Sequence, residues 1–208
     1  MHRLKGMTVA AVMAASVVAL SGNAFAQAKI VDGPEVRWKL GAWGKPRAAT
    51  QNVETLRKFL DERTGGKFKI QIGYESFGNP KELLDLLKVG SLEATNICAS
   101  YHPEKLPVYS ALDLPFLPIP DTTVQEKVHN AFHKHPLVLK EFAGWNAIPY
   151  MSALLPNNEF VGRGKAPKSV EDFKGMRVRA LAGIGEAMRK LGAVPTSVDA
   201  TEVYTSLE

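Results

Sequence analysis

The sequence predicts an α/β domain built on a largely parallel sheet, and three observations support this prediction. Strand patterns alternate with helical patterns from residue 35 to residue 100, with short connections between them. In residues 67–74 apolar and polar side chains alternate, which is the period of a strand. In residues 47–66 apolar side chains recur at helical spacing on one stripe. This alternation of strands and helices favours parallel pairing.

The first half of the chain is expected to fold as strand, helix, strand, helix, strand. The expected elements are strand 35–43, helix 47–66, strand 67–74, helix 79–90 and strand 93–100. Gly65 and Gly66 end the first helix, since glycine accommodates the left-handed conformation of a helix end. Asn79 is the expected N-cap of the second helix, with Pro80 at its first position.

The second half begins with an irregular crossing. Residues 101–123 contain five prolines and several apolar side chains, which predicts a packed loop near a site. The expected elements after it are helices 123–135 and 136–145, strand 147–155, loop 156–169, turn 170–173, strand 176–180, helix 183–193, an extended piece at 194–198 and a helix from 199. The last helical pattern has no C-cap and no following strand, so we expect the sequence to be part of a longer protein.

Residues 1–26 predict a secretory signal peptide. A basic start with Arg3 and Lys5 precedes a short apolar run, and small residues at Ala24 and Ala26 suggest cleavage after Ala26. The run is shorter than the about 20 residues of a spanning helix, although an uncleaved anchor is the alternative. No later segment is apolar enough to span a membrane. We therefore expect an exported, soluble protein located in the periplasm.

Charge and cysteine content argue against a nucleic-acid-binding protein and against a protein stabilised by an internal disulfide. The net charge of +5 includes Arg3 and Lys5, and no block of basic residues with interleaved aromatics occurs, so no nucleic-acid partner is expected. Cys98 is the only cysteine, so an internal disulfide cannot form. Because it lies in an apolar run, we expect a buried, inert thiol.

The sequence contains no motif that predicts catalysis or a cofactor. It lacks a nucleophile elbow, a phosphate-binding loop, a dinucleotide-binding fingerprint and a metalloprotease motif. His129 and His133 have the spacing of a zinc site, but no third ligand is apparent, so solvated helix residues are expected instead of a metal site. Glu171 and Asp172 are expected to cap a turn. We therefore expect a binding protein and not an enzyme.

Two arginines in the segment "MRVR" alternate in a short predicted strand. Arg177 lies inside it, whereas Arg179 lies at its carboxyl end, just before a helix. Ligands of open α/β sheets bind beyond the carboxyl ends of strands. The planar guanidinium matches two oxygens of a carboxylate. Arg179 is therefore the candidate anchor for an anion.

Four segments together resemble the solute-binding proteins of TRAP transporters, of the DctP type. They are "FLDERTGGKFKIQIGYESFGNPKELLDLLKVGSLEAT", "LDLPFL", "EDFKGMRVRALAG" and "LGAVPTSVDATEVYTSLE". The resemblance implies a two-lobed periplasmic binding protein fold, with a largely complete first lobe at 27–150 and an incomplete second lobe at 151–208. It also implies that Arg179 anchors the carboxylate of a small organic acid, which is then delivered to a TRAP membrane permease. A binding protein of an ATP-driven importer or of a sensor system is the alternative, and an exported enzyme is less favoured.

The remaining candidate residues are chosen by position. Trp43, Glu75, Ser100 and Tyr101 follow the first three predicted strands, and for each of them ordinary packing or a solvated loop is the alternative. Members of the resembled family often place another polar contact just before the "EDFKG" loop. This chain has no arginine there, and Asn157 or Asn158 is the substitute. This departure favours a less polar monocarboxylate over a dicarboxylate.

Overall fold

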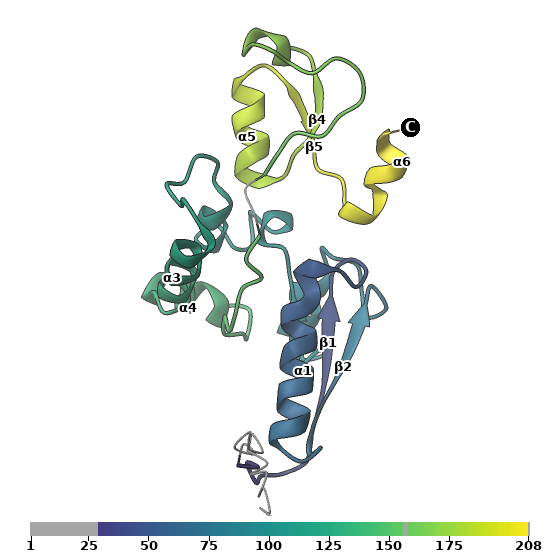
Figure 1. Ribbon diagram of the computed structural model, residues 1–208, viewed down its shortest axis with the longest axis vertical. Coiled ribbons are helices and arrows are strands. Elements are labelled where there is room, and N and C mark those ends of the chain that lie inside the picture. The colour runs from purple at the N-terminus through teal and green to yellow at the C-terminus, as the bar shows by residue number, and fades with distance from the viewer. Residues whose placement is uncertain (1–28, 156–157, 208) are drawn as a thin grey trace, which may run out of the picture.

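The structure is a computed structural model that describes residues 29–155 and 158–207, and two parallel sheets organise it (Figure 1). The strands are β1 Val36–Ala42, β2 Phe68–Tyr74, β3 Ala94–Asn96, β4 Arg177–Arg179 and β5 Val194–Thr196. The helices are α1 Gln51–Arg63, α2 Leu83–Lys88, α3 Thr122–His133, α4 Pro136–Ala143, α5 Ala182–Lys190 and α6 Val203–Leu207. We call the part built on β1, β2 and β3 the first unit, and the part built on β4 and β5 the second unit. The predicted signal peptide lies outside the described residues.

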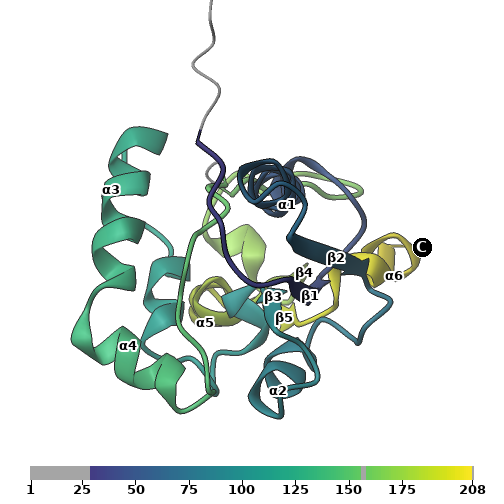
Figure 2. The same ribbon diagram turned by 90° about the horizontal axis from the view of Figure 1, so that it is seen from below.

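The first sheet has the strand order β2-β1-β3 and is parallel throughout, as the sequence predicts. Helices α1 and α2 cover its opposite faces (Figure 2). Leu40 and Ala42 share the face of β1 that packs against Val53 of α1, because alternate residues of a strand point to the same side. On the other face, a Cβ at Gly41 would lie 2.7 Å from Leu83 Cδ2. Glycine at this position lets α2 pack directly on the strand.

A second apolar cluster joins α2 to α4. Leu84, Leu106, Val138 and Phe142 are buried together. The Pro-rich crossing after residue 101 is held against this cluster by Glu141, whose carboxylate accepts hydrogen bonds from the backbone N–H groups of residues 108 and 109 at 2.7 and 2.9 Å. The segment is therefore a loop anchored on α4 through its backbone, but the predicted apolar packing is wrong for Leu114 and Phe116, which are 49% and 92% exposed.

The second unit is a smaller parallel pair. Strands β4 and β5 pair with Arg177 opposite Val194, and α5 packs on them. Ala180, Met188 and Ala193 form its buried core. The expected cap role of Asp172 is confirmed, because its carboxylate accepts the N–H groups of residues 168 and 169 at 2.7 and 3.0 Å, which lowers its pKa. The end of β4 faces the first unit, because Arg179 Nη2 donates a hydrogen bond to the hydroxyl of Tyr101.

Three expected elements differ clearly from the structure. The helix predicted from Asn79 begins at Leu83, because Asn79 Oδ1 accepts the N–H of Lys81 in a local turn instead of capping the helix. The predicted strand 147–155 is not a strand, and it has no strand partner among the described residues. Pro149 cannot donate to a sheet, and Met151 packs its side chain on the core of the first sheet.

The third strand is also shorter than predicted. It ends at Asn96, and Ala99–Tyr101 form a 3-10 turn instead of continuing the strand. None of the described helices is long and apolar enough to cross a membrane.

Candidate functional site

The carboxyl ends of β1, β2 and β3 meet at one edge of the first sheet, and this edge faces the second unit (Figure 1). Trp43 follows β1 and Glu75 follows β2. The N–H of Glu75 donates to the carbonyl of Ala42 at 3.1 Å, and that of Trp43 donates to the carbonyl of Asn96 at 3.4 Å. These bonds extend the parallel ladders by one residue. The strand-end candidates of the first unit are therefore held side by side.

Arg179 lies at the junction between the two units. Its Nε donates to the carbonyl of Val198 at 3.0 Å, and its Nη2 donates to the hydroxyl of Tyr101 in the first unit at 3.2 Å. The N–H of Ala200 donates to the same hydroxyl at 2.8 Å. The hydroxyl of Tyr101 therefore contacts two segments of the second unit, at Arg179 in β4 and at Ala200 after β5. Arg177, two residues earlier in β4, is exposed as Arg179 is, but no hydrogen bond or ion pair to its side chain occurs among the described residues.

A second contact crosses the same junction. Lys81 Nζ of the first unit lies 3.3 Å from the carboxylate of Asp199, whose side chain is almost completely buried. Asp199 directly precedes Ala200 in the chain, and the backbone N–H of Ala200 donates to the Tyr101 hydroxyl. Residues 198–200 are thus fixed against the first unit from two sides.

Trp43 forms an aromatic wall of the junction. Its ring lies edge-on to that of Tyr101, with 5.9 Å between the ring centroids, and its Nε1 donates to Asn96 Oδ1 at 3.1 Å. The guanidinium carbon of Arg47 lies 3.9 Å from the centre of the indole, and Arg47 Nη1 donates to the carbonyl of Trp43 at 2.9 Å. A cation over an aromatic face is stabilising. The indole is therefore held in position by a charged residue and by two neighbouring side chains.

Arg47 was not among the predicted site residues. The signal that could have found it is the turn "WGKPR", which places two basic residues at the carboxyl end of a strand. Gly44 in this turn has a φ of 70°, and a Cβ there would lie 2.3 Å from Arg47 Nη1. Glycine is required at this position because the guanidinium occupies the space of a side chain.

Glu75 is strained and incompletely paired. Its φ of 60° is in the left-handed region, which is uncommon for a residue with a side chain. Its Oε1 is buried with no hydrogen-bond partner among the described residues. Backbone strain and an unpaired buried acceptor are features that gather at functional sites. These two features keep Glu75 among the candidates.

The other candidates lie elsewhere or have other partners. Ser100 donates its hydroxyl proton to Asp113 at 2.6 Å, and burial raises the pKa of that carboxyl. Asn158 is exposed in the loop that connects the two units, and no described contact brings it to the junction. Asn157 lies outside the described residues. Cys98 is half-buried, and burial raises the pKa of its thiol.

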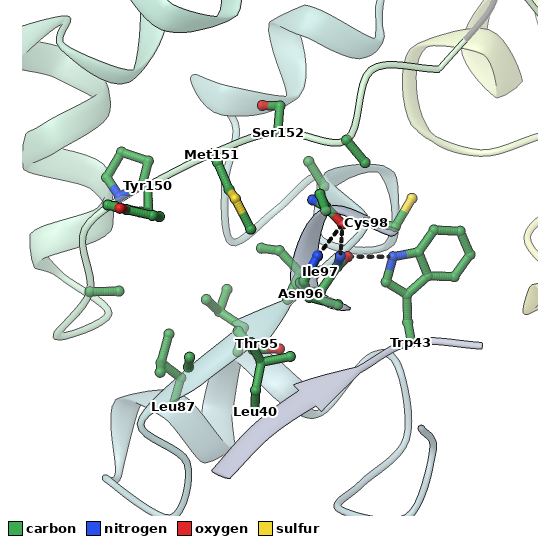
Figure 3. A pocket seen from close by; sticks show the side chains of 18 of the residues that line it. Leu40, Trp43, Leu87, Thr95, Asn96, Ile97, Cys98, Tyr150, Met151 and Ser152 are labelled. Atoms are coloured by element: carbon green, nitrogen blue, oxygen red, sulfur yellow. Dashed lines mark hydrogen bonds between the residues drawn. The ribbon is translucent and has the colours of Figure 1, made fainter. Parts of the chain in front are cut away.

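A cavity of about 400 Å³ adjoins the site on the first unit (Figure 3). Its walls are mainly aliphatic and aromatic and include Leu40, Leu87 and Met151. Trp43 and Asn96 also line it. The indole of Trp43 therefore borders both the cavity and the junction between the two units. The cavity thus extends from the carboxyl edge of the sheet toward the segment 147–155.

The prediction that His133 is a solvated helix residue is wrong, because its side chain is buried. Its Nε2 lies 2.9 Å from the hydroxyl of Tyr109 and 3.1 Å from the hydroxyl of Ser152. The ring also stacks on that of Tyr109. This local pairing occupies Nε2, one of the two ring nitrogens that could bind a metal. Across residues 29–155 and 158–207, no group of three metal-ligating side chains gathers.

The buried imidazole of His102 makes the free energy of unfolding depend on pH. The side chain is 2% exposed, and burial, followed by the charge of Lys105, lowers the pKa of its imidazole below the usual 6.5. The unfolded chain therefore takes up this proton more readily, so the stabilisation is present above pH 6.5 and is lost as the pH falls through the lowered pKa. We expect the free energy of unfolding in urea to fall with acidification in this range. His102→Gln should make the fall shallower, and identical slopes for variant and parent would contradict this expectation.

Comparisons with known proteins show which family the chain resembles. Residues 42–208 match the family described as bacterial extracellular solute-binding protein, family 7. A monocarboxylate 2-oxoacid-binding periplasmic protein of Nostoc sp. is 25% identical over 214 residues, which cover 100% of this chain and 58% of that protein.

Solved structures share the fold. An extracytoplasmic solute receptor of Bordetella pertussis that binds pyroglutamic acid superposes with a TM-score of 0.71 at 22% identity, covering 82% of this chain and 56% of the receptor. A TRAP periplasmic solute-binding protein of Colwellia psychrerythraea, with bound calcium and pyruvate, superposes with a TM-score of 0.64 at 24% identity, covering 83% of this chain and 53% of that one. The chain thus spans little more than half the length of these relatives.

Proposed function

The chain belongs to family 7 of the bacterial extracellular solute-binding proteins, and from this premise we propose that it captures a small organic acid through the guanidinium of Arg179. The predicted two-lobed α/β fold and the resemblance to TRAP solute-binding proteins are confirmed by the family match and by the solved relatives. The family consists of solute-binding proteins and not of enzymes.

The position of Arg179 carries the proposal. Its guanidinium lies at the carboxyl end of β4, where ligands of α/β sheets bind, and it touches Tyr101 of the other unit. An anion bound there would contact both units at once. Aromatic walls from Trp43 and Tyr101 suit a small ligand with little polar surface beyond its carboxylate. Pyruvate and pyroglutamate, which solved relatives bind, are small acids with a single carboxylate.

The proposed setting of this activity is the periplasm. The signal peptide predicted at residues 1–26 supports export with cleavage after Ala26. The family supports delivery of the acid to a TRAP membrane permease. A binding protein that serves an ATP-driven importer or a sensor would have the same lobes and cleft. Two membrane-subunit genes beside the gene of this protein would support the TRAP system.

Binding can be tested with a thermal-shift screen followed by calorimetry. We expect pyruvate or pyroglutamate to stabilise the protein, by about 2.7 kcal/mol at 100 times the dissociation constant. Pyruvamide and pyroglutamide are the matched controls, because they keep the shape of each acid without its charge. If the controls bind as well as the acids, or if neither acid binds, the proposal is wrong.

A further inference from the structure

We propose that the hydroxyl of Tyr101 donates its own proton to the bound carboxylate, so that Tyr101 and Arg179 form a single clamp that selects ionised carboxylates. This inference rests on the proposed function and assigns a role that neither the family match nor the fold assigns. It follows from counting the donors and acceptors at the junction.

The hydroxyl of Tyr101 already accepts two hydrogen bonds. Arg179 Nη2 donates to it at 3.2 Å and the N–H of Ala200 donates at 2.8 Å. A phenol has one proton to donate and two lone pairs that accept. Both neighbours are donors only, so the proton of Tyr101 cannot point to either of them. In the part of the chain that the structure describes, no acceptor lies within hydrogen-bond distance of this proton.

The free proton of the Tyr101 hydroxyl is buried, so it needs a hydrogen-bond acceptor. Tyr101 is only 8% exposed, and a buried donor without a partner is unfavourable. Burial raises the pKa of the phenol, so the proton is present at neutral pH, although the N–H of Ala200 and the charge of Arg179 act in the opposite direction. A carboxylate oxygen bound at Arg179 would supply the missing acceptor.

The guanidinium of Arg179 has one edge partly occupied. Nε donates to the carbonyl of Val198 at 3.0 Å, and one N–H of Nη2 points to Tyr101. The two protons of Nη1 and the second proton of Nη2 remain. A carboxylate must therefore approach the end of the guanidinium, between Nη1 and Nη2. The Nη2 atom is also the one that contacts the phenol oxygen, so the free phenol proton and this end of the guanidinium belong to one site.

The phenol is held in place independently of any ligand. Its ring lies edge-on to Trp43, which is itself bonded to Asn96 and covered by Arg47. A donor that is already oriented loses little freedom when the ligand binds. The clamp presents only donors, which suits a carboxylate, because an ionised carboxylate only accepts. A primary amide would set its own N–H groups against these donors, and we expect it to bind roughly 100-fold more weakly or worse.

The donor role can be separated from a structural role by making the phenol more acidic. 3-Fluorotyrosine placed only at Tyr101 is a better donor and a poorer acceptor than tyrosine. If the phenol donates to the ligand, calorimetry at pH 6 should show pyruvate or pyroglutamate binding about two- to fivefold more tightly. If the phenol only accepts from Arg179 and Ala200, binding should weaken. The same analogue at Tyr204, which is 78% exposed and does not line the cavity, is the control.

A second variant removes the hydroxyl and keeps the ring. Tyr101→Phe should weaken binding of the same acid by about 10- to 100-fold and should narrow the preference for acid over amide. Unchanged or weaker binding with the fluorinated residue, while the parent protein binds the acid, overturns the donor role and leaves the proposed function standing. Failure of the parent protein to bind either acid overturns both.

Discussion

Replacing Arg179 with lysine is expected to weaken binding of the organic acid by about 1–3 kcal/mol. Lysine keeps the positive charge but loses the planar fork that can meet two carboxylate oxygens. It also cannot reproduce the geometry with which the guanidinium contacts both the carbonyl of Val198 and the hydroxyl of Tyr101. The measurement is isothermal calorimetry with the acid that gives the largest thermal shift.

Arg177 provides the matched control for this variant. It lies two residues earlier in the same strand and is exposed as Arg179 is, but its side chain makes no hydrogen bond or ion pair with the described residues. Arg177→Lys should therefore leave the dissociation constant nearly unchanged. Equal affinities of the parent and the Arg179→Lys variant would refute the carboxylate clamp, and a comparable loss in both variants would point to a general disturbance of β4 instead of a contact specific to Arg179.

Replacing Leu84 with alanine is expected to lower the free energy of unfolding by about 2–5 kcal/mol. The side chain is 0% exposed and packs with Leu106, Val138 and Phe142, which come from separate parts of the first unit. Removing most of it would leave a cavity that these neighbours cannot readily fill. Urea denaturation of both proteins measures the difference.

Leu137 on α4 is the control for this core substitution. Its side chain is 57% exposed, so Leu137→Ala removes little buried surface and should change the free energy of unfolding by less than about 0.5 kcal/mol. If Leu84→Ala is equally mild, the cluster between α2 and α4 does not stabilise the first unit as the packing implies.

The parallel sheet could be predicted from sequence because its signals are local. The strict alternation at β2 and the apolar stripe of α1 depend only on neighbours within one element. The segment 147–155 has a similar apolar character, but whether it becomes a strand depends on a partner strand elsewhere in the chain. In the structure Met151 packs on the core of the first sheet, whereas Ile148 and Tyr150 are 78% and 72% exposed. Periodicity cannot distinguish these two outcomes.

The candidate site could be predicted only in part for the same reason. The rule for strand ends identified Trp43, Glu75 and Tyr101, because parallel strands bring their carboxyl ends together. It could not show that Tyr101 meets Arg179, which is 78 positions away in the chain. It also missed Arg47, whose role comes from lying over an indole and not from its place in a pattern.

The fluorescence of the Trp43 indole can report on ligand binding at the junction. Tryptophan emission responds to the polarity and charge around the ring, and this ring contacts both the Arg47 guanidinium and the Tyr101 phenol. The chain has three tryptophans, and the other two, Trp38 and Trp145, belong to other clusters of the first unit. With those two replaced by phenylalanine, stopped-flow fluorescence could follow the arrival of an unlabelled acid at the junction in real time.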